Sequence, residues 1–379
     1  MRYTQKFFGC IGVFDMKKLF FTVLILALCL SVCGCAAKSQ PEPVAETRII
    51  TDALGREVEI PTVIERIVPL GNGPRMCTYL GLQDRFVTIT QSEISDNPLM
   101  AYGWYNQESW KDLPIAASGG YGVIHPEVIL EAEPDLIICT YEQEIVEDIV
   151  RQTGLPVIAV AQGELFGEDY DEALRIIADA CGVQQRAEEL IGFIDTCLED
   201  LDTRCKGQNS PEALAAAATF RGGHGIGGVY VKYSLFDVIS ANDVTDELDR
   251  GSWGHGLEVD LEQVMAWDPE YIFLDAGNVG LVQAELEQMP DYFSQLSAFK
   301  SGKVYQCPNS TSNYSNVEIP LVSSYYIASV LYPDAFADID LEAKAEEIFS
   351  LFLGHNGFLD VLEEHGFEYK NLSFGDLNA

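Results

Sequence analysis

The chain has 379 residues, of which 47% are hydrophobic, and it carries 59 acidic side chains against 23 basic ones. This length and hydrophobic content suit two ordinary folded domains and exclude a disordered polymer. The formal net charge of −36 argues against nucleic acid and anionic membrane surfaces as partners, because both repel an acidic protein. The same acid excess is also what an exported protein needs simply to stay soluble.

Residues 1–35 are predicted to be a lipoprotein signal peptide, with translation starting at Met16. Two lysines precede an apolar run from Leu19 to Val32, which is too short to span a bilayer comfortably. The run ends in VCGC, where Gly34 precedes Cys35 as in a bacterial lipobox. We expect cleavage before Cys35 and lipidation of its thiol, so that the protein is exported and anchored to the cell membrane. An uncleaved helical anchor is the alternative.

The mature chain is expected to fold as two α/β lobes. Residues 36–47 are predicted to be a flexible tether, and residues 48–183 alternate short apolar runs with helical patterns, which is typical of a parallel sheet covered by helices. Residues 184–206 have apolar side chains at helical spacing and predict one long connecting helix. Residues 207–379 repeat the α/β alternation. The predicted fold class is therefore α/β, with two Rossmann-like lobes joined by a single long α-helix.

Ten cysteines are present, and four of them fall in the leader region. The other six are scattered without any C-x-x-C pair: Cys77, Cys139, Cys181, Cys197, Cys205 and Cys307. Several lie in apolar strand or helix patterns, where cysteine acts as a small core residue. We therefore expect neither a disulfide framework nor a cysteine-rich zinc site.

A fifteen-letter unit occurs twice in the sequence. HPEVILEAEPDLIIC (His125–Cys139) returns without a gap as DLEQVMAWDPEYIFL (Asp260–Leu274), and Glu127 aligns with Glu262. An acid in the first turn of a helix is favoured by the helix dipole, but this does not explain the same position in both copies. Helix N-termini and strand carboxyl ends lie at the same side of an α/β lobe, so we expect one glutamate on each rim of a cleft.

The loops at these strand ends supply the candidate ligand-binding residues. In the first lobe they are Asn72, Arg75, Trp104, Tyr105, Tyr121, His125 and Tyr141, and in the second they are Arg221, His224, Trp253, His255, Asn278 and Tyr314. Aromatic faces suit a flat or bulky chelate, amides can orient it, and arginine can bind its carboxylate or phenolate oxygens. Each residue has a purely structural role as the alternative.

Three of the candidates are histidines, which raises the possibility of direct metal binding or of an axial bond to haem or a corrinoid. His125, His224 and His255 all fall in predicted cleft loops, but their sequence spacing matches no metal motif. No metal site is assigned on this basis. The three residues stay possible ligands.

Taken together, the sequence resembles the substrate-binding lipoproteins of bacterial ABC importers for iron–siderophore complexes, haem and cobalamin. The resemblance covers residues 47–374 and rests on the lipobox, the opening TDALGREVEIP…ERIVPLG, the twin Glu…Pro-acid motifs and the long central helix. It implies two lobes bridged by one helix, with an iron(III) chelate bound between them and no cofactor or catalysis. It further implies that Glu127 and Glu262 dock onto arginines of the two subunits of a permease dimer, which works with its ATPase.

Three other interpretations remain open. Haem or cobalamin could be the solute of the same kind of protein. A metal-dependent extracytoplasmic hydrolase could use the three histidines. A surface receptor or sensor lipoprotein would have the same leader and fold but no permease.

Overall fold

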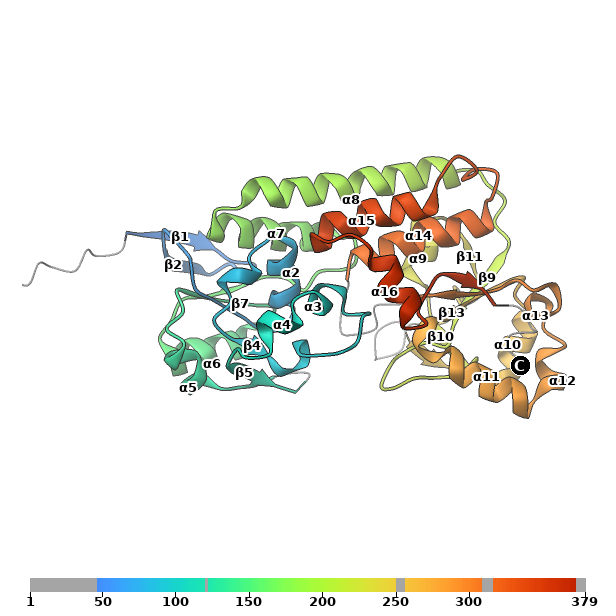
Figure 1. Cartoon of the computed structure of the whole chain (residues 1–379), viewed down its shortest axis with the longest axis horizontal. Coiled ribbons are helices and arrows are strands. Elements are labelled where there is room, and N and C mark those ends of the chain that lie inside the picture. Colours follow the sequence, from blue (N-terminus) through green and yellow to red (C-terminus); the bar gives the residue numbers. More distant parts are fainter. Residues whose placement is uncertain (1–45, 120–121, 250–255, 309–315, 373–379) are drawn as a thin grey trace, which may run out of the picture. The chain divides into compact units, whose positions relative to one another are not determined.

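The structure, a computed structural model, describes residues 46–119, 122–249, 256–308 and 316–372 (Figure 1). The predicted signal peptide with Cys35 and nearly all of the tether lie outside these residues. The chain from Thr47 onward forms one compact unit. Among the described residues, no helix has the length and the apolar character that a membrane span requires.

Two sheets and a hairpin make up the region before the long helix. Its strands are β1 (Thr47–Thr51), β2 (Glu57–Pro61), β3 (Ile67–Pro69), β4 (Ile89–Thr90), β5 (Ile115–Ser118), β6 (Val123–Ile124), β7 (Leu136–Cys139) and β8 (Val157–Ala159). The order β3-β7-β8 is parallel throughout, with β7 in the centre. All four residues of β7 are buried, as expected for an apolar strand covered on both faces.

Short helices surround these sheets. They are α2 (Gly73–Tyr79), α3 (Ala101–Trp104), α4 (Gln107–Trp110), α5 (Pro126–Glu131), α6 (Gln143–Thr153) and α7 (Glu168–Cys181), with 3-10 turns η1 (Gln83–Arg85) and η2 (Gln91–Glu93). The helix α6 ends at Gly154, whose φ of 67° supplies the left-handed cap that stops a helix.

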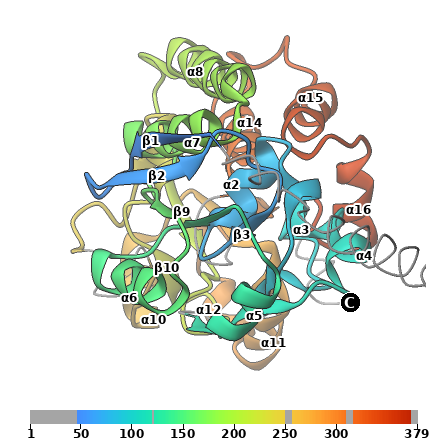
Figure 2. The same ribbon diagram turned by 90° about the vertical axis from the view of Figure 1, so that its left-hand side faces the viewer.

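The predicted connecting helix is α8 (Gln184–Cys205), a helix of 22 residues. Its buried side chains form one stripe, and Figures 1 and 2 both place α7 and α14 beside it. The guanidinium of Arg186 donates to the carbonyls of Tyr79 at 3.0 Å and Leu351 at 2.5 Å. One arginine of α8 therefore ties the first lobe to the C-terminal helices.

The described residues of the second lobe form a single sheet. Its strands are β9 (Glu212–Ala216), β10 (Gly228–Tyr230), β11 (Asn242–Asp243), β12 (Gly256–Glu258), β13 (Tyr271–Asp275), β14 (Val304–Cys307) and β15 (Lys370–Asn371). The order is β12-β10-β9-β13-β14-β15, and β11 pairs with β9. The strands β9, β13 and β14 are parallel, with β13 in the centre.

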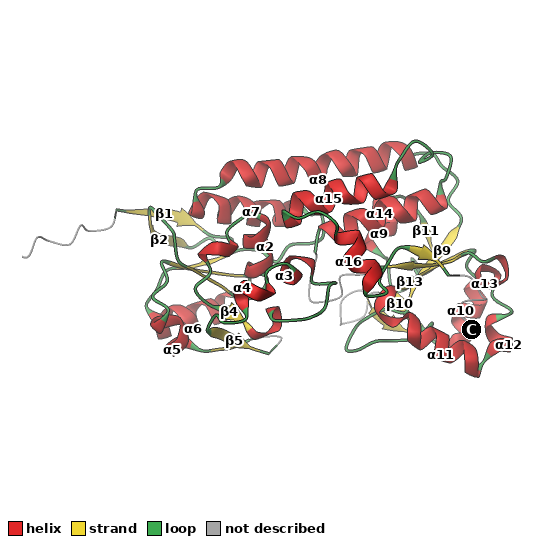
Figure 3. Ribbon diagram, viewed as in Figure 1, coloured by secondary structure: helices red, strands yellow, loops and turns green. Residues whose placement is uncertain are grey.

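Helices cover this sheet and continue to the end of the described chain (Figure 3). They are α9 (Ser234–Val238), α10 (Leu261–Trp267), α11 (Val279–Gln288), α12 (Pro290–Phe293), α13 (Ser297–Ser301), α14 (Glu318–Leu331), α15 (Leu341–Leu353) and α16 (Phe358–Glu364), with the 3-10 turn η3 (Ala276–Asn278). The helix α14 contacts α8, and α15 contacts α2, so the two lobes belong to one compact unit.

The predicted fold class is confirmed, because parallel sheets flanked by helices lie before and after α8. The repeated unit forms α5 and β7 in the first lobe and α10 and β13 in the second. Its strand is therefore the centre of a parallel triplet in both lobes. All six cysteines outside the leader region are free and buried, as their apolar surroundings predict.

Candidate functional site

The carboxyl ends of the central parallel strands define the candidate site. In the first lobe, Asn72 follows β3 and Tyr141 follows β7. In the second lobe, Thr219 follows β9 and Asp275 ends β13. Loops at this edge of an α/β sheet are where such folds bind ligands.

At the edge of the first lobe, a tyrosine ring fits against two glycines. Gly71 has a φ of 61°, and a Cβ built on it would lie 2.4 Å from the Thr140 hydroxyl and 3.3 Å from the Tyr141 ring. A Cβ at Gly122 would lie 2.8 Å from the Tyr141 hydroxyl. The backbone N–H of Asn72 donates to Thr140 Oγ1 at 2.9 Å. Burial raises the pKa of Tyr141, so this half-buried ring stays a neutral phenol.

Arg75 is buried near this edge, with 3% of its surface exposed. Its guanidinium lies 5.3 Å from the centre of the Tyr102 ring. The hydroxyl of Tyr102 donates to Glu93 Oε2 at 2.6 Å. Burial raises the pKa of Glu93, and the Tyr102 hydroxyl and Arg75 partly offset this shift. Arg75 thus belongs to a group of buried ionisable side chains.

This group, the buried polar centre, continues into the second lobe. Its members lie within electrostatic reach of one another and are Arg75, Tyr79, Glu93, Tyr102, Tyr170 and Glu318. The Tyr79 hydroxyl donates to Glu318 Oε2, while Glu318 Oε1 is buried and accepts no hydrogen bond from any described residue. Burial raises the pKa of Glu318 to about 7. A carboxyl group that is fully buried in this way favours its neutral form.

A second polar link joins the lobes close to Glu318. Asn316 is 0% exposed, and its Nδ2 donates to the carbonyl of Leu99 at 2.7 Å. Of the buried polar centre, only Arg75 was predicted. A signal was present, because Glu318 is the single charged residue of a mostly apolar helix of fourteen residues. A helix with so few polar residues is expected to be buried, so its one charged residue is buried with it or functional.

The aromatic pair predicted in the first lobe packs against the C-terminal helices. The Trp104 ring meets His365 edge-on, with ring centres 4.8 Å apart. The Tyr105 ring stacks on His355 at 4.3 Å. At least one side of each ring is therefore covered by protein. A role of the two rings in ligand binding stays a prediction.

His125 and His224 are both hydrogen-bonded. His125 Nε2 lies 2.8 Å from Ser118 Oγ. His224 Nε2 donates to the Phe220 carbonyl at 2.8 Å, and its Nδ1 lies 2.6 Å from Glu258 Oε2. Because both nitrogens of His224 have partners and its ring stacks on Phe220 at 3.9 Å, metal binding would require breaking these contacts.

The edge of the second lobe carries a polar network centred on Asp275. Its Oδ2 accepts the hydroxyls of Thr219 at 2.9 Å and Tyr230 at 3.1 Å. Asn278 Nδ2 donates to Thr219 Oγ1 at 2.6 Å and to the Ala217 carbonyl at 2.8 Å. Of these residues, sequence analysis named only Asn278. The network fixes the side chains of Thr219 and Asn278 and the Tyr230 ring at the sheet edge.

Arg221 is exposed in the loop after β9 and has a φ of 52°. The remaining candidates lie outside the described residues: Tyr121, Trp253, His255 and Tyr314. Within the described ranges, no three His, Cys, Asp or Glu side chains are grouped so that they could hold a metal ion. His255 lies outside these ranges.

The twin glutamates occupy equivalent places. Glu127 is the second residue of α5 and Glu262 is the second residue of α10, and both side chains are exposed. In both copies the following strand begins at the aligned residue, Leu136 or Tyr271. The repeat therefore presents the same carboxylate from the same place in each lobe.

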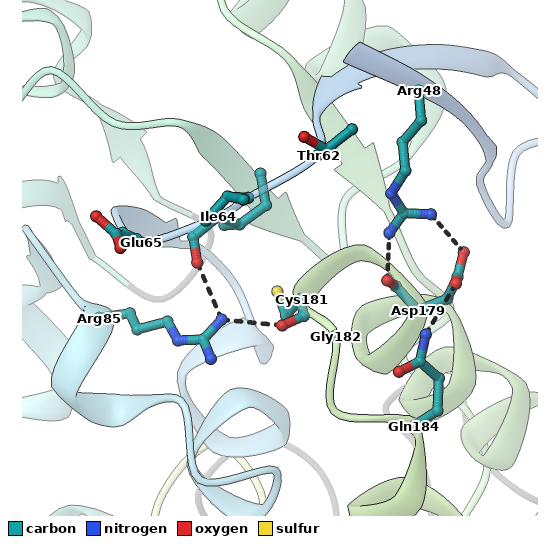
Figure 4. A pocket seen from close by; sticks show the side chains of 10 residues that line it. Arg48, Thr62, Ile64, Glu65, Arg85, Asp179, Cys181, Gly182 and Gln184 are labelled. Atoms are coloured by element: carbon teal, nitrogen blue, oxygen red, sulfur yellow. Dashed lines mark hydrogen bonds and ion pairs between the residues drawn. The ribbon is translucent and has the colours of Figure 1, made fainter. Parts of the chain in front are cut away.

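A cavity of about 410 Å³ lies at the opposite edge of the first lobe (Figure 4). Arg85 donates there to the carbonyls of Ile64 at 2.9 Å and Cys181 at 3.0 Å, and Arg48 pairs with Asp179 at 3.1 Å. Ile64 precedes β3, so the cavity is at the amino end of the parallel strands. It is not the predicted ligand site.

The chain is similar to known proteins in both sequence and fold. Residues 100–311 match the sequence model of a family described as "Periplasmic binding protein". YvrC of Bacillus subtilis, named an uncharacterized ABC transporter substrate-binding lipoprotein, is 22% identical over an alignment of 331 residues that covers 83% of this chain and 97% of YvrC. The molybdate-binding protein MolA of Haemophilus influenzae is 22% identical over 334 residues, covering 80% of this chain and 90% of MolA.

A solved structure has the same fold. The periplasmic solute binding protein of Veillonella parvula gives a TM-score of 0.68 at 18% identity, covering 85% of this chain and 97% of that one. None of these matches supports the metal-dependent hydrolase considered above.

Proposed function

The chain belongs to the periplasmic binding protein family and is the solute-binding component of an ABC transporter, and from this premise we propose that it captures an iron(III) chelate. The chelate would lie between the two lobes, at the carboxyl ends of the central strands. The protein would then deliver it to a membrane permease dimer that works with an ATPase. It performs no chemistry on its solute.

The observation that carries the proposal is the combination of aromatic rings and fixed neutral polar groups at these strand ends. The first lobe contributes the Tyr141 phenol, and the second contributes the stacked rings of Tyr230 and Tyr233, whose centres are 5.2 Å apart. Thr219 and Asn278 are held by the Asp275 network. Flat faces with a few oriented polar groups suit a bulky organic chelate better than a bare ion.

The histidine contacts favour a metal that arrives already chelated. His224 has both ring nitrogens in hydrogen bonds, and His125 lies against Ser118. A bare cation would have to displace these partners, whereas a chelated metal needs only surface contacts. Haem and cobalamin fit the same reasoning and remain the alternative solutes. The 22% identity to MolA is too low to transfer its molybdate to this chain.

Docking and anchoring complete the proposal. Glu127 and Glu262 are exposed, occupy the same place in both lobes and can each pair with an arginine of one permease subunit. Lipidation of Cys35 would keep the protein at the membrane, on its outer or periplasmic face. Anchoring raises the local concentration of the protein at the permease.

The test is to identify the bound solute. The protein is purified from cells grown with and without iron, and its absorbance and its mass spectrum after denaturation are recorded. A siderophore charge-transfer band with the matching mass is the expected result. A Soret band or a corrin spectrum would replace the iron chelate by haem or cobalamin, and stoichiometric molybdenum would overturn the chelate.

A binding titration locates the site. Tyr141→Leu is expected to weaken binding of the identified solute about tenfold, because a ring at the strand edge is lost. Tyr271→Leu is the matched control, since Tyr271 begins β13 at the opposite edge of its sheet. Equal effects of the two changes would contradict the proposed location.

A further inference from the structure

A second pocket lies among the C-terminal helices. It has a volume of about 360 Å³ and is lined by residues of α14, α15 and α16 and of the segment after α16. The three helices are neighbours at the red end of the chain in Figure 1. This volume falls within the range of small-molecule sites. The site proposed above uses none of its lining residues.

Tyrosine rings form much of the pocket wall. Tyr325, Tyr326 and Tyr369 line it, and the rings of Tyr326 and Tyr369 are 5.0 Å apart. Two of the hydroxyls are held by the protein, because Tyr325 donates to Asp200 Oδ2 at 2.9 Å and Tyr369 lies 3.0 Å from Ser323 Oγ. Hydroxyls fixed in this way leave the rings as ordered aromatic surfaces.

The charged groups around these rings are mostly acidic. Four carboxylates line the pocket, Glu342, Asp360, Glu363 and Glu368, against the single ammonium of Lys344. Glu368 Oε1 pairs with Lys370, but its Oε2 is buried and accepts no hydrogen bond from the residues that the structure describes. A carboxylate whose second oxygen has no donor is only partly compensated, and it adds to the negative charge around the pocket.

Lys344 already shows the contact that a cation makes with this wall. Its ammonium lies 5.4 Å from the centre of the Tyr325 ring and 2.5 Å from Glu347 Oε2. Tyrosine faces attract cations, and this attraction adds to that of nearby carboxylates. Lys344 is thus an internal example of the ring-and-carboxylate environment that a bound organic cation would find.

We propose that the pocket between α14, α15 and α16 binds a small organic cation with a flat apolar body, such as an arylalkyl ammonium. The tyrosines, together with Val322, Leu341 and Leu359, would hold the apolar body. The carboxylates would hold the ammonium group. An anion is disfavoured by the four carboxylates.

The location gives binding a structural consequence. His355 and His365 flank α16, and they are the residues that contact the first lobe here: His355 stacks on Tyr105, and His365 meets Trp104 edge-on. A ligand that ties α16 to α14 and α15 therefore stabilises the C-terminal side of this interlobe contact. Binding to the folded protein raises its unfolding temperature.

The test uses three probes of one shape: 4-phenylbutylammonium, 4-phenylbutanol and 4-phenylbutyrate. Calorimetry is carried out on the chain from residue 36 onward. The ammonium is expected to bind with a Kd of about 1 mM or tighter, the alcohol at least tenfold more weakly, and the carboxylate not measurably. Equal binding of ammonium and alcohol, or no binding of either, overturns the proposal.

Two variants and a matched control locate the site. Glu363→Gln is expected to weaken ammonium binding about threefold to fivefold, because it removes one of the lining carboxylates. Glu364→Gln is the control, since Glu364 is an exposed neighbour in α16 that does not line the pocket. Leu359→Trp is expected to fill the pocket and abolish binding. Equal weakening by the two glutamine variants, or full binding by Leu359→Trp, would place the ammonium elsewhere.

Discussion

The two copies of the repeated unit keep the same backbone but differ in their polar contacts. Glu133 has a φ of 43° and its aligned residue, Asp268, a φ of 41°. Ile129 and Val264 are fully buried at equivalent places. The copies therefore agree in an unusual backbone conformation and in the core contact, beyond the agreement of their letters.

The difference lies in what each copy does with its acids. Asp135 accepts the backbone N–H groups of Glu65 and Arg66 at 2.8 Å each, whereas its aligned residue, Glu270, pairs with Lys303 at 2.5 Å. Among the aligned acids, only Glu127 and Glu262 are the same residue type, and both are exposed. A position that stays the same while its polar neighbours diverge is what the proposed docking onto two permease subunits predicts.

The largest expected effect breaks this symmetry. Charge reversal at both positions, Glu127→Arg with Glu262→Arg, is expected to reduce solute uptake by cells to background, because both arginine contacts of the permease become repulsive. Solute binding by the purified protein should stay within twofold. Glu131→Arg with Glu287→Arg is the control, since these exposed acids lie on α5 and α11 without the equivalence. Equal loss of binding and uptake would remove the docking assignment.

The next largest effect is expected at the buried polar centre, where the lobes meet, and it concerns the dependence of stability on pH. Burial raises the pKa of Glu318 to about 7 from an ordinary 4.5, so the folded state holds a proton that the unfolded state loses. The contribution of Glu318 to stability is then largest below pH 4.5 and falls as the pH rises to 7, by about 3 kcal/mol in all. Glu318→Gln should therefore stabilise the protein at pH 8 and remove this slope.

Urea unfolding between pH 4.5 and 8 measures this slope. Glu342→Gln is the matched control, because Glu342 is exposed in the first turn of α15. A Glu318→Gln variant that loses stability at pH 8 would show that the carboxylate is ionised and paired there. That result would contradict the neutral form assigned to it.

A smaller effect on stability is expected to distinguish Glu133 from Asp268, the aligned residues with positive φ in the two copies of the repeat. Asp268 accepts the N–H and the hydroxyl of Ser297, both at 2.7 Å, and these bonds lower its pKa. Asp268→Ala is expected to cost about 1–2 kcal/mol at pH 7, and the loss should disappear as the pH falls below 4. Glu133→Ala, at the aligned exposed position, should cost less than about 0.5 kcal/mol. Equal losses in urea unfolding would refute the assignment.

The smallest effect on stability is expected at the residues with positive φ that follow β3 and β9, the first strand of each parallel triplet. The first lobe places Gly71 after β3 with a φ of 61°, while the second places Ala217 after β9 with a φ of 56°. A non-glycine residue in this conformation costs about 1 kcal/mol, so Ala217→Gly should stabilise the protein by roughly that amount. Ala218→Gly, at a buried neighbour without positive φ, should destabilise it. Thermal unfolding distinguishes the two variants.

Much of the fold could be predicted from the sequence because its signals are local. The apolar run LIIC and the helical spacing after Gln184 correspond to β7 and to α8, which begins at Gln184. Tertiary contacts could not be predicted in this way. Trp104 and Tyr105 were predicted from their loop alone, yet they pack against histidines about 250 residues later. No sequence period encodes such a pairing.

The sequence by itself determined the two α/β lobes, the single long helix and the twin glutamates, because apolar periodicity and an aligned repeat specify elements and their order. The tertiary structure alone decided which ionisable groups are buried together. Arg75 and Glu318 are more than 200 positions apart, and only the packing of α14 against the first lobe brings their charges within reach of each other. Desolvation depends on every atom around a group, and it therefore cannot be read from the residues beside it in the chain.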